Sequence, residues 1–202
     1  MQGKTGMILL LAFAVVLLFA SCARKRGDSA MQTYVNEIEP PSDEIQSIDA
    51  IWQIEDEASF VIEMDRYIAE KCAYGDHMEA LNDAQRVFYI TQALEMEVNN
   101  GGFAQFFYNS SGMFANEIVS AFEKISAVKT AEICKKAVSI YGGAVPLDRD
   151  EREAVLVPED EAEEERIEEI LDVCDSAFFA YEEDLFTLNY QFILDNKDAF
   201  SK

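Results

Sequence analysis

Apolar side chains recur with helical spacing along almost the whole chain, and this periodicity constrains the fold more than any other feature. Phe60, Met64, Tyr67 and Ile68, for example, are spaced i, i+4, i+7 and i+8, which places them on one face of a helix. The run AVLV at residues 154–157 is the only β-like stretch. The sequence therefore predicts an all-α fold, a compact multi-helix bundle.

Capping and turn residues divide this pattern into helices. Ser42 is expected to cap the first helix, and Asn82, followed three residues later by Gln85, forms a capping box that opens another. Ser110 or Ser111 is expected to cap the next one. The expected inward-facing residues of these last two helices are Val87, Ile90, Leu94, Val98, Ile118, Phe122 and Ile125. Further helices are expected at residues 128–141, 159–180 and 183–196, with an ordered loop or a short extended pair at residues 144–158.

The first 21 residues have the pattern of a signal peptide. Lys4 precedes an unbroken apolar run of fourteen residues, 7–20, which is shorter than the roughly 20 residues that cross a hydrocarbon core. The sequence LFASC, which ends at Cys22, resembles the lipobox of bacterial lipoproteins. The resemblance implies that Cys22 is lipidated and becomes the first residue of the mature protein. An uncleaved anchor helix that ends at the basic residues 24–26 is the alternative.

Both interpretations place the protein at a membrane of the bacterial cell envelope, on the periplasmic or surface side. Residues 22–41 are polar and include Pro40 and Pro41, which is typical of a flexible tether. The remaining residues, 42–202, are enough for a single all-α domain with one core. The sequence thus predicts a signal peptide at 1–21, a lipidated tether at 22–41 and one folded domain.

The charge balance limits the possible partners. The chain carries 39 acidic and 16 basic residues, a net charge of −23. Direct binding to nucleic acid is excluded by this balance, because affinity for phosphates depends on clustered Lys and Arg. Half of the residues are hydrophobic, so the charge belongs to the surface of a folded body and not to a disordered acidic chain. A basic protein is the expected partner.

Metal-binding and cofactor motifs are missing from the sequence. Apart from Cys22, the cysteines are Cys72, Cys134 and Cys174, with no CxxC pair among them. Residues 148–154 lack the glycine and the spacing of a calcium-binding EF-hand loop. We therefore expect no metal and no cofactor. The three cysteines are either buried thiols, or two of them form one disulfide.

The acidic run at residues 159–175 is the first candidate site. On a helical wheel its carboxylates share one arc, and Ile167, Ile170, Leu171 and Cys174 share the other. Six charges over eleven residues give about 3.3 Å of helix rise per charge, close to the roughly 3.4 Å per phosphate of a DNA strand. A solvated helix face has the same pattern. The candidate partner-binding residues, here called the acidic stripe, are Glu161, Glu164, Glu165, Glu168, Glu169 and Asp172, with residues 148–153 and 182–184 at the edges.

The stretch EVNNGGFAQFFYNSSG, residues 97–112 and here called the corner, is the second candidate. The two asparagines and two glycines that follow Val98 tolerate positive φ, so a sharp turn and a short segment that buries phenylalanine rings are expected. The amide side chains either bond exposed backbone groups or orient a substrate, with Glu97 as a base. The residues of interest are Asn99, Asn100, Gly101, Gly102, Phe103, Gln105, Phe106, Asn109 and Gly112.

The corner also carries a resemblance to a known family. VNNGGFAQFFYNSSG, with LNDAQRVFYITQALEMEV before it and ANEIVSAFEKISAVKTAEICKKA after it, resembles the C-terminal domain of the DNA-mimic protein family of the DMP type. The terminal FFAYEEDLFTLNYQFILDN fits the last helices of that family, so the resemblance covers residues 81–196. It implies a compact, mostly helical fold. In the best-known family type it also implies an acidic surface that imitates DNA and occupies a DNA-binding protein.

Several functions are compatible with these features. The favoured hypothesis is a non-enzymatic binding module on a lipoprotein anchor that inhibits or sequesters a basic, DNA-binding-like protein through the acidic stripe. An immunity or inhibitor protein of the cell envelope is one form of this hypothesis. One alternative is a cytoplasmic-type DNA mimic that acts on a transcription factor. Another is an enzyme built on the corner, but His77 is the single histidine, and no nucleophile elbow or phosphate loop completes a catalytic set.

Overall fold

The computed structural model describes residues 46–202, and these residues fold as one body. The predictions for the signal peptide, for lipidation of Cys22, for the tether at 22–41 and for a helix cap at Ser42 lie outside the described residues.

The described chain is helical and contains no strand, which confirms the predicted all-α class. Short 3₁₀ segments connect several of the helices. The α-helices are α3 (Ile48–Ile51), α4 (Glu57–Lys71), α5 (Asp83–Tyr108), α6 (Ile118–Lys124), α7 (Val128–Val138), α8 (Arg149–Leu156), α9 (Glu161–Phe179), α10 (Leu185–Asp195) and α11 (Lys197–Phe200). The 3₁₀ segments are η1 (Ala73–Gly75), η2 (Met78–Ala80), η3 (Ser110–Phe114) and η4 (Ser139–Tyr141).

Side-chain caps define where most of these helices begin. Asn82 accepts the N–H groups of Ala84 and Gln85, and Gln85 reaches back to the Asn82 backbone, so the predicted capping box is confirmed. Four aspartates each accept an N–H group three residues further on, at the starts of α4, α8, α9 and α10. These capping aspartates are Asp56, Asp148, Asp160 and Asp184. A negative side chain at this position satisfies a free N–H group and opposes the helix dipole.

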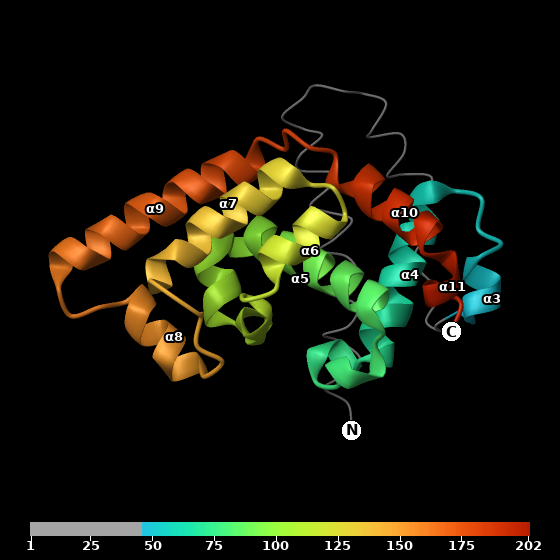
Figure 1. Ribbon diagram of the computed structural model, residues 1–202, viewed down its shortest axis with the longest axis horizontal. Helices are drawn as coiled ribbons and strands as arrows, with labels where there is room; N and C mark the ends of the chain where they lie inside the picture. Colours follow the sequence, from blue (N-terminus) through green and yellow to red (C-terminus); the bar gives the residue numbers. More distant parts are fainter. Residues whose placement is uncertain (1–45) are drawn as a thin grey trace. The chain divides into compact units, whose positions relative to one another are not determined.

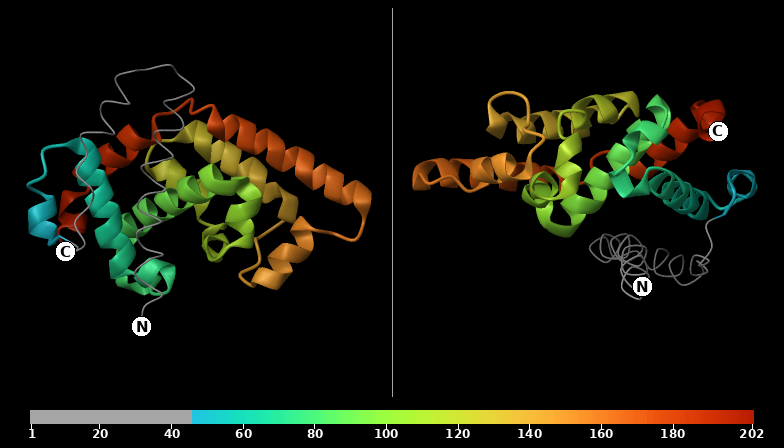
Figure 2. Two further views of the ribbon diagram at one scale, coloured as in Figure 1. Left: turned by 180° about the vertical axis from the view of Figure 1, so that it is seen from behind. Right: turned by 90° about the horizontal axis from the view of Figure 1, so that it is seen from below.

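Helix α5 occupies the centre of the body and packs against α4, α6, α8, α9, α10 and α11 (Figure 1). Helices α7 and α9 lie side by side in the left view of Figure 2 and contact each other. The helices share one hydrophobic core, and the predicted inward-facing residues of α5 and α6 are confirmed. All of them are buried: Val87, Ile90, Leu94, Val98, Ile118, Phe122 and Ile125. The C-terminal segment returns to this core, where Phe200 is fully buried against Phe88.

The structure corrects two local predictions. Residues 144–158 are not a loop or an extended pair, because α8 forms there behind the cap of Asp148. Arg152 of this helix is buried and donates to backbone carbonyl oxygens of neighbouring segments, which the β-like run AVLV does not reveal. Neither Ser110 nor Ser111 caps a helix: the Ser111 hydroxyl donates to Glu97 instead, and α6 starts without a side-chain cap.

Candidate functional site

The acidic stripe lies on the outer face of α9. Its opposite face is anchored in the core by Ile167, Leu171 and Cys174, which are all at least 95% buried. Ile170 packs against the core from the edge of that face. The six carboxylates therefore extend from a backbone that the core holds in place. Five of them are exposed and Glu164 is half-exposed: Glu161, Glu164, Glu165, Glu168, Glu169 and Asp172.

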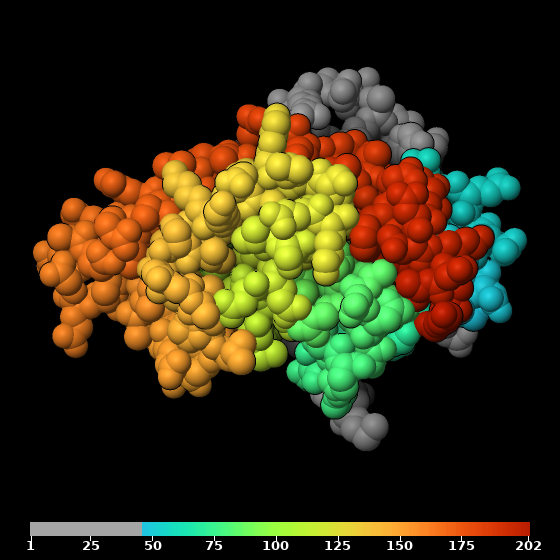
Figure 3. Space-filling model, viewed as in Figure 1, coloured from blue at the N-terminus to red at the C-terminus, as the bar shows by residue number. Residues whose placement is uncertain are grey.

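Within the described residues, the stripe side chains form no ion pair and no hydrogen bond. Arg166, the only basic residue within α9, pairs instead with Glu163 on the flank of the helix, at 2.6 Å. The hydrogen bond from Arg166 holds the pKa of Glu163 below its usual range. The surface of α9 is uncovered at one end of the body in the view of Figure 3. The stripe thus faces solvent without a counter-ion among the described residues.

The corner begins with a break in α5. Gly101 has φ −161° and Gly102 has φ 77°, so the helix axis changes direction between them, as the glycines predict. Asp175 of α9 accepts the N–H group of Phe103 at 2.8 Å and caps the segment that follows. A Cβ atom at Gly102 would lie 2.3 Å from an Asp175 oxygen. Gly102 is therefore required both by its φ angle and by the approach of Asp175.

A carboxylate holds the two arms of the corner together. Glu97 accepts hydrogen bonds from Gln105 Nε2 at 2.7 Å, from Asn109 Nδ2 at 2.9 Å and from Ser111 Oγ at 2.9 Å. Gly101 leaves room for this network, because a Cβ atom there would lie 2.2 Å from the Gln105 side-chain oxygen. The amides and the carboxylate thus bond one another across the turn, which is a structural arrangement.

Arg152 fixes α8 to the corner from the other side. Its side chain is 1% exposed and donates to the carbonyl oxygens of Phe107 at 2.6 Å, Leu147 at 2.7 Å and Asn109 at 3.0 Å. Burial lowers the pKa of this guanidinium. A Cβ atom at Gly112 would lie 2.6 Å from Arg152 Nε, so the glycine admits the arginine. The rings of Phe103 and Phe106 are fully buried beside this contact.

The two asparagines of the corner have different surroundings. Asn99 donates to the hydroxyl of Tyr181, which in turn donates to Glu95 at 2.9 Å. Burial raises the pKa of Glu95 to about 7. Asn100, in contrast, is exposed and forms no hydrogen bond with any described residue. Asn99 therefore helps to join α5 to the end of α9, whereas Asn100 has no such structural task.

The expected edges of the stripe have largely structural tasks. Asp148 caps α8, Arg152 is buried, and Asp184 caps α10. Glu183 accepts the N–H groups of Lys129 and Thr130 at the start of α7. Burial raises the pKa of Glu183, but these hydrogen bonds outweigh it and hold the pKa below its usual range. Asp148, Glu183 and Asp184 are therefore engaged in the fold, whereas Asp150, Glu151 and Glu153 remain exposed beside the stripe.

Sequence reasoning assigns no task to Arg152, Asp175 or Glu95, although they hold the corner and the end of α9. A weak signal exists for Arg152, which is one of two basic residues in an acidic run and is followed by the apolar residues 154–157. The partners of Asp175 and Glu95 are far away in the sequence. Their tasks become visible only when the helices are placed.

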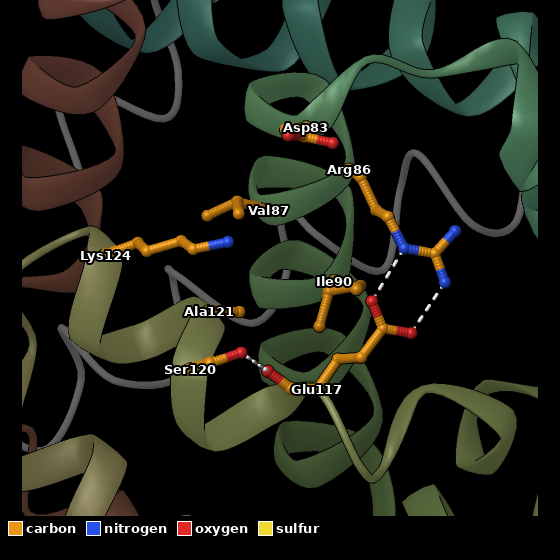
Figure 4. A pocket seen from close by; sticks show the side chains of 8 residues that line it. All are labelled: Asp83, Arg86, Val87, Ile90, Glu117, Ser120, Ala121 and Lys124. Carbon is orange, nitrogen blue, oxygen red and sulfur yellow. Dashed lines mark hydrogen bonds and ion pairs between the residues drawn. The ribbon is translucent and has the colours of Figure 1, made fainter.

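A groove of about 310 Å³ lies between α5 and α6 (Figure 4). Arg86 Nε and Nη2 donate to the two oxygens of Glu117 at 2.7 and 2.6 Å and join the helices. Lys124 extends into the groove in Figure 4, and Asp83 lies at its rim. Because two cationic and two anionic groups line it, this groove is suited neither to a strongly anionic nor to a strongly cationic ligand.

Other chemical features are sparse in residues 46–202. This range contains no group of three or more His, Cys, Asp and Glu side chains that could hold a metal ion. Cys72, Cys134 and Cys174 are free thiols and buried. Burial raises the pKa of the Cys174 thiol to about 11 and that of Cys134 still further, which makes both poor nucleophiles. Within the same range, no helix combines the length and apolarity that crossing a membrane requires.

The comparisons with known proteins bear on the corner and on the helices around it. No curated protein and no solved structure matches the chain. The family described as DMP19-like protein matches residues 79–196, which is more than half of the chain and includes the whole corner, α6 to α9 and α10. This match confirms the resemblance seen in the sequence. The chain therefore belongs to the DMP19-like protein family.

Proposed function

We propose that this protein acts by binding, and that the acidic stripe of α9 captures a basic, DNA-binding-like protein. The observation that carries the proposal is that six carboxylates project from one anchored helix face and none of them is paired within the described residues. Regularly spaced charge on a fixed backbone attracts a cationic surface and loses little entropy on binding. Membership in a family named for a DNA-mimic type of protein supports the same interpretation.

A catalytic function of the corner is the less favoured candidate. Glu97, Gln105 and Asn109 bond one another across the turn, so the groups that would serve as base and substrate clamp are already engaged. We therefore propose that the corner shapes the domain and that the stripe provides recognition.

We further propose that the protein works at the bacterial cell envelope on a lipid attached to Cys22. The lipobox-like LFASC and the basic residues that follow it support this location. Fractionation of cells and mass spectrometry of the N-terminal peptide test it. A cytosolic, unlipidated protein would overturn the envelope proposal and would favour a DNA mimic that acts on a transcription factor.

The binding proposal is tested by partner capture from membrane fractions at low and high salt. One variant replaces four stripe residues with the matching amides: Glu165, Glu168, Glu169 and Asp172. The control variant removes the same charge from four exposed sites elsewhere: Glu55, Glu70, Glu123 and Asp198. We expect capture to weaken at high salt and to be lost in the stripe variant only. Equal loss in both variants would mean that total charge, and not the stripe, attracts the partner, and salt-insensitive capture would contradict the proposal.

A further inference from the structure

Three large apolar side chains are exposed around the contact between the corner and α8. Tyr108 is 39% exposed, Met113 is 43% exposed and Leu147 is 68% exposed. Tyr108 ends α5, Met113 lies in η3, and Leu147 directly precedes the cap of α8. A single exposed apolar side chain is normal on a protein surface, whereas several at one place mark an interaction site. These three residues are here called the apolar patch.

A buried guanidinium holds the backbone on both sides of the apolar patch. Arg152 donates to the carbonyl oxygens of Phe107 at 2.6 Å and of Asn109 at 3.0 Å, the two residues that flank Tyr108. It also donates to the carbonyl oxygen of Leu147 itself, at 2.7 Å. The side chains of Tyr108 and Leu147 therefore leave the fold from neighbouring points, although they are far apart in the sequence.

Met113 belongs to the same place because of the glycine before it. A Cβ atom at Gly112 would lie 2.6 Å from Arg152 Nε, so the backbone next to Met113 runs against the same guanidinium. All three side chains thus start from backbone that one buried group fixes. A surface that is fixed before a partner arrives loses little conformational entropy on binding.

Charge indicates which kind of partner covers the apolar patch. The acidic residues Asp150, Glu151 and Glu153 of α8 follow Leu147 closely in the chain, and all three are exposed. Carboxylates repel anionic lipid. They also repel a second copy of the chain, which carries its own net charge of −23. A cationic protein segment, in contrast, is attracted to this side of the domain.

The ring of Tyr108 indicates which cation suits this surface. The guanidinium carbon of Arg149 lies 4.0 Å from the centre of the ring, which is a cation–π contact. The ring thus already holds a guanidinium, and arginine is the basic residue enriched in protein interfaces. The chemistry of this surface therefore fits a segment that presents arginine beside bulky apolar side chains.

We propose that the apolar patch is an anchor point for the basic partner, and that it binds a segment in which bulky apolar side chains lie beside arginines. The inference rests on the proposed capture of a basic protein and adds the contacts that retain it. Charge complementarity mainly speeds the encounter of two proteins, whereas a few well-packed side chains supply most of the affinity. The carboxylates attract the segment, and Tyr108, Met113 and Leu147 hold it.

Two synthetic peptides that bind to the full chain test this inference. The peptide LRRLLRRLLRRL places leucine and arginine on opposite faces of a helix, and ARRAARRAARRA has the same charge without the bulky apolar side chains. Isothermal titration calorimetry measures both dissociation constants. We expect the leucine peptide to bind the native protein about tenfold more tightly than the alanine peptide. Equal affinities of the two peptides would overturn the inference.

A patch variant and a matched control locate the binding site of the leucine side chains. The patch variant replaces Tyr108, Met113 and Leu147 by serine. The control replaces three other exposed apolar residues by serine: Val128, Phe179 and Leu194. We expect the preference for the leucine peptide to be lost in the patch variant and kept in the control. Leu147→Ser alone, at the most exposed of the three patch sites, should lower the preference with the least effect on folding, which circular dichroism checks.

The remaining outcomes separate the apolar patch from the acidic stripe and from other occupants. A preference that survives in the patch variant, or that the control loses equally, would contradict the anchor. The variant with amides at four stripe positions should weaken both peptides alike, and unchanged binding there would count against the stripe while leaving the patch result valid. Loss of vesicle binding or of a dimer in the patch variant only would show that an anionic membrane or a second copy covers the patch, and either result contradicts the inference.

Discussion

Asp175 on α9 accepts the backbone N–H group of Phe103 on α5 at 2.8 Å, across 72 residues of sequence. The bond stands where Gly101 and Gly102 break α5, so a residue of one helix caps the restarted turn of another. The corner is therefore a tertiary arrangement, and its stability depends on α9 as much as on its own glycines.

Removing this cap is expected to destabilise the domain. Asp175→Ala leaves the Phe103 N–H group without its acceptor and should lower the free energy of unfolding by about 1–2 kcal/mol. Asp175→Asn keeps an acceptor and should cost less. Gly102→Ala should cost about 2–3 kcal/mol, because it combines a positive φ with a close contact. Urea denaturation measures all three, with Asp172→Ala as the exposed control that should change little.

Gly112 and Arg152 are expected to be energetically coupled. Arg152→Ala should lower the free energy of unfolding by about 3 kcal/mol, because buried carbonyl oxygens lose their donors. Gly112→Ala forces its new methyl group onto the guanidinium. The double variant should therefore be less destabilised than the sum of the single variants, by about 0.5–2 kcal/mol. Strict additivity in this cycle would contradict the contact. Part of the Gly112→Ala cost should remain, because the Phe107 carbonyl oxygen is also close.

Glu95 is expected to make stability fall as pH rises. Burial raises its pKa from 4.5 to about 7, so the folded state binds a proton more tightly than the unfolded chain. The stabilisation is complete below the unfolded pKa and is lost as pH rises through the folded pKa. Glu95→Gln keeps the acceptor for Tyr181 and cannot ionise. Between pH 5 and pH 8 the native protein should lose about 2 kcal/mol relative to this variant.

Urea denaturation at four pH values between 5 and 8 provides the measurement. Asp65 acts in the same direction, because burial raises its pKa to about 6. Asp65→Asn should therefore remove a second part of the pH dependence, over a lower pH window than Glu95→Gln. Parallel stability curves for the native protein and Glu95→Gln would show that Glu95 ionises normally in the folded state.

The charges of the acidic stripe are expected to lower the stability of the domain slightly. Carboxylates four residues apart repel each other, as in the pairs Glu165 with Glu169 and Glu168 with Asp172. Replacing these four residues by the matching amides should raise the free energy of unfolding by about 0.5–1 kcal/mol at low salt, and the gain should shrink at high salt. Denaturation at two salt concentrations checks this. A clear loss of stability would mean that the stripe has structural partners.

The two ends of the corner are expected to respond differently to the same substitution. Asn109→Ala removes a hydrogen bond to Glu97 and should cost about 1 kcal/mol. Asn100→Ala should change the melting temperature little, because Asn100 is exposed and has no hydrogen-bond partner among the described residues. Lost partner capture with unchanged stability in Asn100→Ala would give this residue a place in the binding surface. A cost equal to that of Asn109→Ala would contradict the observed geometry.

Local sequence rules were sufficient to predict the elements that neighbouring residues determine. The capping box of Asn82 and Gln85, the buried stripe of α5 and the break at Gly102 follow from spacing and from residue type, and the structure contains all three. Helix α8 could not be predicted, because Arg152 becomes an inward-facing residue only when the Phe107 carbonyl oxygen is placed beside it. An arginine within an acidic run is normally expected at the protein surface.

The corner likewise shows which structural details cannot be predicted from local sequence rules. Its glycines predict a turn, but they do not predict which side chains pack against them. Gln105, Asp175 and Arg152 each come close to a different glycine, and two of the three lie outside the corner. Glu97 illustrates the point for chemistry: in the sequence it is compatible with a catalytic base, and its three hydrogen-bond donors appear only in the folded chain.

The capping aspartates and the stripe carboxylates are two distinct sets among the acidic residues of this domain. Asp56, Asp148, Asp160 and Asp184 each satisfy the first turn of a helix, while the stripe glutamates extend into solvent without a structural task. Thus one set of acidic residues stabilises the helices, and a different set gives the surface its negative charge. Exchange of the displayed carboxylates for neutral residues should therefore leave the architecture beneath them intact.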